Sequence, residues 1–293
     1  MEQIISYNQQ FFSKSKDQYY IMNTQRSFKY NKDLSQPNHR LISGHHKYGH
    51  LYEPDIGNFL TRIVKPGDVC VDVGANIGMH TLLMASLADE LGKVISFEPN
   101  SECFNELKNN IKINNYSTID ARKRLLGEKS KDEIYYFASK EDTGTSYAMT
   151  EIDDQKSKWK KIKTSNLDTE LKDEKNIKVL KMDVEGFEGH ILRGSKNLLE
   201  KNLIRYWIIE YAPHCLERNN DSLDTLRNLM GKKGLEMFIL DPSGGLPKFI
   251  PNKVSLKIQT IPNLLFTNTK YLNEDWVMED LENHVKPRNL WPY

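Results

Sequence analysis

The chain has 293 residues, enough for one large domain or two small ones, and 38% of them are hydrophobic. This composition is typical of a soluble globular protein, and no run approaches the ~18 apolar residues that a membrane-spanning helix needs. The 41 basic residues nearly balance the 40 acidic ones, so the chain lacks the strong basic excess of a dedicated nucleic-acid-binding protein.

The N-terminal segment, residues 1–58, is interpreted as an extension that could form a lid over an active site. Its first fifty or so residues are polar and weakly periodic, and the stretch 43–50 predicts a loop. Residues 52–60 regain amphipathic spacing and predict a helix against the sheet. No basic segment with an apolar core opens the chain, and the three cysteines are far apart, so we expect a reduced, cytoplasmic protein.

Strands and helices alternate from residue 59 to 270, which predicts an α/β domain with a Rossmann-like, doubly wound, mostly parallel sheet. Seven strands are expected, at 69–73, 93–97, 118–123, 177–183, 205–211, 235–241 and 263–268. Helices are expected at 77–90, 101–114, 188–200 and 221–233.

Two further segments are attached to this pattern. A β insertion between the third and fourth strands has expected strands at 133–137 and 161–164, and its turn-rich part, 142–147, could approach a substrate. The tail 271–293 contains Trp276 and Trp291 and is expected to dock on the domain or on another subunit. The lysine cluster 156–163 follows acidic residues, so we interpret it as a solvated loop, with phosphate binding as the alternative.

The most informative segment is Val69-Cys-Val-Asp-Val-Gly-Ala-Asn-Ile-Gly78, followed by Ile95-Ser-Phe-Glu-Pro99. Alternate valines predict a parallel strand that is buried on both faces. Gly74 and Gly78 permit a tight turn and a close approach to a ligand. Glu98 at the tip of the next strand is placed to accept hydrogen bonds from a ribose hydroxyl pair. The combination predicts a nucleoside site at the carboxyl edge of the sheet.

The identity of the cofactor depends on two side chains in this turn. A dinucleotide site needs Gly-x-Gly-x-x-Gly, but Asn76 replaces the second glycine, and Asp72 would repel a pyrophosphate. A carboxylate suits the cationic amino-acid end of S-adenosylmethionine, so we predict that cofactor; a nicotinamide-dependent oxidoreductase is the alternative on the same fold. The expected cofactor-binding residues are Asp72, Gly74, Ala75, Asn76, Gly78, Glu98, Pro99 and Asp183.

Four blocks of the sequence resemble the FkbM family of methyltransferases, in the family's order. They are Pro66–Gly78, Val94–Asn100, the segment Ser165–Leu171 with Val179–Glu188, and Ile208–Tyr211. The resemblance covers roughly residues 60–245. It implies a class I methyltransferase fold, S-adenosylmethionine as the cofactor and O-methylation of a hydroxyl, which several members carry out on sugars.

Methyl transfer to a weakly acidic hydroxyl needs alignment and a proton acceptor, and such groups belong at the carboxyl ends of the middle strands. Alternation places Lys181, Asp183 and Glu185 on one side of such a strand. Glu210 ends the adjoining, otherwise apolar strand. The alternative is structural: Lys181 and Glu210 could form an ion pair across the two strands and have no catalytic role. His80, in the first turn of the helix after the glycine turn, is a further candidate base or a packing residue.

The expected partner is a small-molecule or glycan acceptor, with a neutral sugar hydroxyl favoured. An RNA ribose 2′-hydroxyl and a catalytically silent binding module remain alternatives, and a homo-oligomer is possible. His214 could line the acceptor pocket. Asp183 and Glu185 are hard oxygen donors that could hold a divalent cation, but the sequence shows no dedicated cage, so the prediction is an enzyme without a metal.

Overall fold

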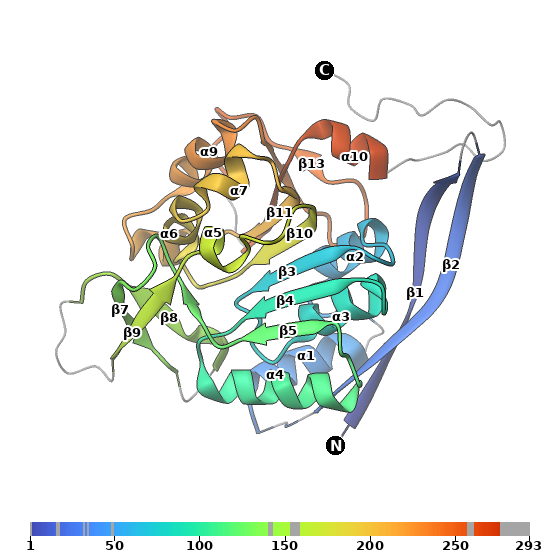
Figure 1. Cartoon of the computed structure of the whole chain (residues 1–293), viewed down its shortest axis with the longest axis horizontal. Coiled ribbons are helices and arrows are strands. Elements are labelled where there is room, and N and C mark those ends of the chain that lie inside the picture. The colour runs from blue at the N-terminus through green and yellow to red at the C-terminus, as the bar shows by residue number, and fades with distance from the viewer. Residues whose placement is uncertain are drawn as a thin grey trace.

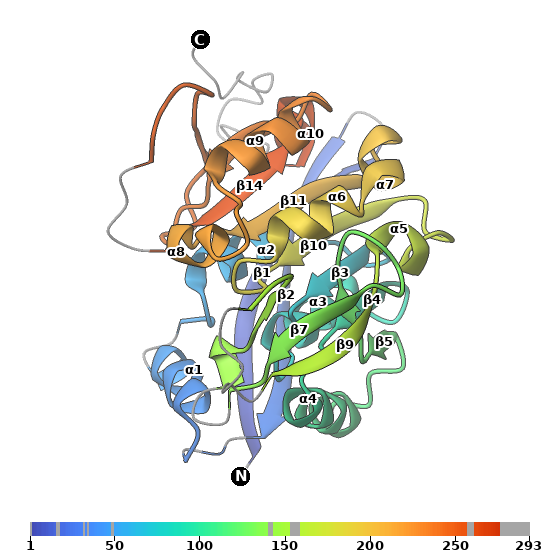
Figure 2. The same cartoon turned by 90° about the vertical axis from the view of Figure 1, so that its left-hand side faces the viewer.

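The centre of the molecule is an eight-stranded mixed sheet with helices on both faces (Figures 1 and 2). The computed structural model describes residues 2–15, 18–31, 33, 35–47, 50–139, 143–152, 159–256 and 261–275. The strand order is β13-β12-β14-β11-β10-β3-β4-β5. The strands are β3 (Val69–Val73), β4 (Lys93–Phe97), β5 (Ile119–Arg122), β10 (Ile177–Met182), β11 (Ile204–Glu210), β12 (Glu236–Ile239), β13 (Lys248–Phe249) and β14 (Asn263–Thr267).

Parallel pairing joins β11, β10, β3, β4 and β5, and β14 is antiparallel to both of its neighbours. The predicted doubly wound, mostly parallel sheet is therefore confirmed. The prediction of seven strands was one short, because β13 has only two residues at the sheet edge and leaves no periodic signal. Among the described residues, no helix combines the length and the apolar character that crossing a membrane requires.

Helices cover the two faces of this sheet and form a separate apolar core on each. One core packs under α2 (Pro54–Ile63), α3 (Met79–Ala88) and α10 (Thr269–Asp275). The other packs under α6 (Glu188–Arg193), α7 (Lys196–Glu200), α8 (Pro213–Glu217) and α9 (Leu223–Gly231). The helix α4 (Ser101–Ile113) packs against β5 and against the N-terminal strand β2 (Gln18–Asn31). Since strands β3 and β10 lie between the two cores, polar side chains on them need partners inside the protein.

The predicted helix 188–200 is interrupted, and this prediction was wrong in its middle. The helices α6 and α7 are separated at Gly194, where an added Cβ would lie 2.3 Å from the carbonyl oxygen of Gly127. Gly194 follows the last turn of α6, a position where glycine is common, and its lack of a side chain admits the backbone of Gly127. The amide of Gly194 still closes the helix on the carbonyl of His190.

A four-stranded sheet forms the insertion, as predicted, with the order β6-β9-β7-β8. Its strands are β6 (Leu125–Leu126), β7 (Glu133–Phe137), β8 (Tyr147–Met149) and β9 (Lys160–Ser165), and α5 (Leu167–Glu170) leads back to the main sheet. Of the lysine cluster, Lys160, Lys161 and Lys163 are exposed on β9, whereas residues 156–158 lie outside the described residues.

The N-terminal segment differs from the predicted loop. Strand β1 (Glu2–Ser15) pairs antiparallel along its whole length with β2 (Gln18–Asn31), and α1 (Pro37–Lys47) follows. The helix includes residues 43–47, which were expected to be a loop; Pro37 at its start has the φ angle that a first turn requires. The end of β2 is fixed by α4, because the amide of Asn31 donates to Asn110 Oδ1 over 2.8 Å.

At the other end of the chain, the tail begins within α10. Asp275 accepts hydrogen bonds from Lys178 (2.5 Å) and Tyr206 (2.8 Å), so this helix is fixed to the sheet, as expected for a docking segment. Residues 276–293, including Trp276 and Trp291, lie outside the described residues.

Candidate active site

A cavity of about 850 Å³, including its open mouth, lies at the carboxyl ends of β3, β4 and β10. Three parts of the chain enclose it: the glycine turn after β3, the β insertion, and the N-terminal segment through Ile42 and Tyr52. The segment predicted to approach a substrate contributes Gly144, Ser146 and Tyr147 to its wall. The ligand site is thus at the sheet edge that the sequence indicated.

The glycine turn is held by backbone contacts to both neighbouring strands. The amides of Gly74 and Ala75 each donate to the carbonyl of Phe97 over 3.0 Å. Gly74 has φ +77°, and a Cβ there would lie 1.8 Å from the carbonyl oxygen of Asp183. Gly74 lines the cavity, and its lack of a side chain also admits the backbone at the tip of β10. Asn76 also has a positive φ, 51°, and its amide points to Glu98.

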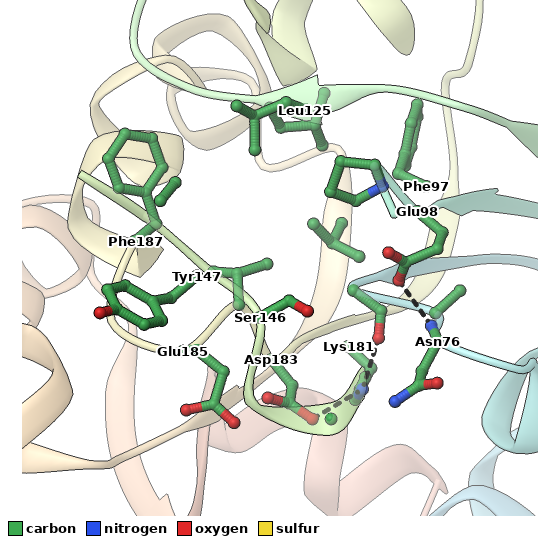
Figure 3. Close-up of a pocket in the computed structure, with 18 of the residues that line it drawn as sticks. Asn76, Phe97, Glu98, Leu125, Ser146, Tyr147, Lys181, Asp183, Glu185 and Phe187 are labelled. Carbon is green, nitrogen blue, oxygen red and sulfur yellow. Dashed lines mark hydrogen bonds and ion pairs between the residues drawn. The ribbon is translucent and has the colours of Figure 1, made fainter. Parts of the chain in front are cut away.

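Glu98 is fixed by two backbone amides at the tip of β4. Its Oε2 accepts from the amide of Asn76 over 2.8 Å (Figure 3), and its Oε1 accepts from the amide of Asn100 over 2.7 Å. Burial raises the pKa of this carboxyl to about 7, although these two amides act in the opposite direction. Each oxygen has a second lone pair, so the carboxylate is prepared to accept hydrogen bonds from a hydroxyl pair.

Apolar side chains form the opposite wall of the cavity. Phe97, Leu125 and Phe187 surround the space beyond Glu98 in Figure 3, and Leu126 and Tyr136 also line it. A hydroxyl-binding carboxylate beside an apolar wall matches a nucleoside, whose sugar is polar and whose base is flat and largely apolar. The residues present therefore fit the predicted S-adenosylmethionine.

Asp72 lies beneath the cavity and does not line it. It is 0% exposed; its Oδ2 accepts a hydrogen bond from Thr81 over 2.6 Å, and its Oδ1 is 3.8 Å from Lys181 Nζ. The reason is strand alternation, since Val71 and Val73 belong to one core and Asp72 points away from it. The structure thus gives this predicted cofactor-binding residue a partner inside the protein, Lys181.

Lys181 connects Asp72 to the cavity. Its Nζ donates to Asp183 Oδ2 (3.2 Å) and to the carbonyl of Gly74 (3.3 Å; Figure 3). Burial alone lowers the pKa of this lysine, but the charges of Asp183, Asp72 and Glu53 outweigh burial and raise it. The ammonium therefore stays charged and orients Asp183 at the cavity wall. The alternative pairing was wrong, since the ion pairs of Lys181 are with Asp72 and Asp183, not with Glu210.

Three carboxylates meet next to the cavity, from distant parts of the chain. One carboxylate oxygen each from Glu53, Asp183 and Glu210 lies within 4.8 Å of the others. Burial, reinforced by neighbouring carboxylates, raises the pKa of Glu210 to about 11 and that of Glu53 to about 8. The sequence analysis had brought Asp183 and Glu210 together, but it had not found Glu53.

His80 lies beside this group of carboxylates. It is 4% exposed, and its Nε2 is 3.5 Å from Glu53 Oε2. Burial and the charge of Lys181 lower the pKa of the imidazole well below its usual value, so it is neutral at neutral pH. His214, in contrast, is exposed and is not part of the cavity wall.

The structure brings most of the predicted site residues to one place. The predicted residues that line the cavity are Gly74, Ala75, Asn76, His80, Glu98, Pro99, Lys181, Asp183 and Glu185. Asp72, Gly78 and Glu210 do not line it. Asp72 and Gly78 are next to lining residues in the sequence, and Glu210 has a carboxylate oxygen within 4.8 Å of one from Asp183. The sequence analysis missed Glu53, and also Tyr52 and Phe187. The local sequence gives no signal for Glu53: a residue before proline is expected to be extended, whereas the φ of Glu53 is 45°.

Comparison with known proteins identifies the family to which this chain belongs. The family model described as "Methyltransferase FkbM domain" matches residues 72–237, more than half of the chain. Methyltransferase 1 of Beauveria bassiana is 28% identical over 60% of this chain and 76% of its own length. Hexuronic acid methyltransferase AglP of Haloferax volcanii is 30% identical over 54% of this chain and 62% of its own length. A solved methyltransferase FkbM from Methylobacillus flagellatus KT has a TM-score of 0.44 and 15% identity, covering 81% of this chain and 56% of its own.

Proposed function

Since this chain belongs to the FkbM family of S-adenosylmethionine-dependent methyltransferases, we propose that it methylates a hydroxyl of a sugar or of a glycosylated metabolite. The observation that carries the proposal is Asp183, a carboxylate held at the cavity wall by Lys181. The similarity to a hexuronic acid methyltransferase and the near-zero net charge both favour a small carbohydrate over a polyanion.

The cofactor would be held by the turn 74–78 and Glu98, with its base against Phe97, Leu125 and Phe187. Bound S-adenosylmethionine supplies an activated methyl group, so the protein has to align the acceptor oxygen and remove its proton. Asp183 is the proposed proton acceptor, because Lys181 holds one of its oxygens and leaves the other toward the cavity. Lys181 positions Asp183, and Glu185 and His80 complete the wall on the acceptor side.

An acceptor screen tests the proposed function. Purified protein would be incubated with radiolabelled methyl donor and, in parallel, neutral sugars, hexuronic acids, small non-sugar alcohols and RNA. Label in a sugar or uronic acid fraction, with little dependence on salt, is the expected result. Label on ribose of RNA, with binding that falls steeply as salt rises, would replace the sugar by a nucleic acid.

Glu98→Ala is expected to weaken binding of S-adenosylmethionine by about 1–3 kcal/mol, because a charge-assisted hydrogen-bond acceptor is removed. Titration calorimetry with the cofactor or its demethylated product measures the change. Glu102→Ala is the matched control, since this carboxylate is exposed and lies four residues further on. Equal affinities for wild type and Glu98→Ala would remove Glu98 from the cofactor site.

Cofactor affinity is also expected to depend on pH through Glu98. Its pKa is raised to about 7 in the free protein, and a ribose hydroxyl pair can donate fully to both of its oxygens only when the carboxyl is ionised. Affinity should therefore be constant above pH about 7 and fall below it, by up to about tenfold per pH unit, because the proton must leave on binding. Calorimetry from pH 5.5 to 8.5 would show the slope, and in Glu98→Ala the profile should be flat.

A further inference from the structure

The acidic cluster beside the cavity has features of an ion site that the cofactor does not explain. Its members are Glu53 from the start of α2, Asp183 from the tip of β10 and Glu210 from the end of β11. Each offers an oxygen within 4.8 Å of the other two. Of the three carboxylates, Asp183 forms an ion pair with Lys181, and the same lysine also pairs with Asp72. Ionising all three carboxylates would leave more negative charge than Lys181 offsets, and a bound divalent cation would neutralise that excess.

A second observation, at a side chain outside the cluster, points to a missing ligand. His80 is 4% exposed, and its Nε2 has no hydrogen-bond partner. The atom faces Glu53 Oε2 at 3.5 Å, beyond the usual limit of about 3.2 Å for a nitrogen-oxygen hydrogen bond, and this oxygen is also buried without a partner. Buried polar atoms are normally paired. Two unpaired ones that face each other at the edge of the cluster indicate that a group is bound there.

We propose that Glu53, Asp183 and Glu210 bind a divalent cation, next to His80 and at the side of the cofactor cavity. Carboxylate oxygens are ligands preferred by hard cations, so the site is suited to Mg²⁺, Mn²⁺ or Ca²⁺. This differs from the sequence-based expectation of a metal-free enzyme, which was made without Glu53. The three ligands lie far apart in the chain, and no spacing motif could reveal them.

The position of this cation suggests a role in binding the methyl acceptor, an inference that rests on the proposed function. Asp183 both belongs to the cluster and lines the cavity, so open coordination positions of the cation would face the acceptor. Two neighbouring oxygens of a sugar, from a diol or from a hydroxyl and a carboxylate, could occupy those positions. The cation would then fix the acceptor and make the coordinated hydroxyl more acidic.

Binding of Mn²⁺ to chelator-treated protein, without acceptor or cofactor, tests the site by itself. Electron paramagnetic resonance and calorimetry should find one saturable site per chain, from which Mg²⁺ competes. Glu53→Gln and Glu210→Gln should each weaken Mn²⁺ binding at least ~10-fold. This is the smaller of the losses in metal affinity that are typical when residues around a bound metal are substituted. Glu185→Gln is the matched control: it removes the same charge from a neighbouring carboxylate outside the cluster and should change affinity only a few-fold.

Thermal unfolding of the metal-free variants checks that they fold. If a Gln variant does not, Glu53→Asp and Glu210→Asp keep the charge while withdrawing the oxygen by one methylene, and they too should weaken Mn²⁺ binding. Absence of saturable Mn²⁺ binding to the wild type, or wild-type affinity in both cluster variants, overturns the proposal. These measurements need no methyl acceptor. A failed acceptor screen would therefore leave the metal site unaffected, and a failed Mn²⁺ experiment would leave the proposed sugar acceptor unaffected.

Discussion

Asp183→Asn is expected to reduce turnover on a genuine acceptor by ~10²–10⁴, the usual contribution of a positioned proton acceptor. Asparagine has nearly the same shape but cannot take the hydroxyl proton, and it loses the ion pair with Lys181 at 3.2 Å. In the proposed site the cofactor would be held mainly by Glu98 and the glycine turn, so its affinity should change much less. Single-turnover methyl transfer and cofactor calorimetry measure the two effects separately.

Two comparisons separate proton acceptance by Asp183 from its other roles. The loss should persist at saturating Mn²⁺, because added cation restores binding of the ion but not the missing base. Glu185→Gln removes the other carboxylate of the cavity wall and should have a smaller effect on turnover. If Asp183→Asn keeps near-normal turnover, the base is elsewhere, and Glu185 and His80 are the next residues to test.

Gly74→Ala is expected to lower the free energy of unfolding by about 2–5 kcal/mol and to abolish tight cofactor binding. The methyl group would lie 1.8 Å from the carbonyl oxygen of Asp183, and φ is +77°. The left-handed conformation costs a residue with a side chain about 1–2 kcal/mol, and displacing packed backbone costs about 1–3 kcal/mol more. Denaturant unfolding and cofactor calorimetry on the same samples measure both.

Gly234→Ala is the matched control for that substitution. Gly234 has φ +72°, but no atom lies within 4 Å of the place of its Cβ. It should show only the conformational cost of about 1–2 kcal/mol and normal cofactor affinity. Equal losses in the two variants would mean that the contact between Gly74 and Asp183 contributes nothing beyond backbone conformation.

The sheet could be predicted because its buried strands are short apolar runs that end in recognisable turns. The glycine turn, Glu98 and the tips of β10 and β11 were likewise found from local patterns. What failed depends on contacts between distant segments. Glu53 reaches Asp183 across 130 positions of the chain, and Gly194, where α6 ends, lies against the backbone of Gly127. The hairpin β1–β2 has a polar, weakly periodic sequence, which gives no reason to expect strands.

If the proposed site is correct, the contact between Gly74 and Asp183 also links the two binding events thermodynamically. Gly74 opens the turn that would hold the cofactor, and Asp183 carries the carboxylate that faces the acceptor, while the carbonyl of Asp183 rests on Gly74. A shift of the turn on cofactor binding would therefore be transmitted to Asp183 without any intervening residue. Such linkage is reciprocal: by whatever factor bound cofactor changes the affinity for acceptor, bound acceptor changes the affinity for cofactor. Release of the demethylated cofactor and release of the methylated product then become interdependent steps of one cycle.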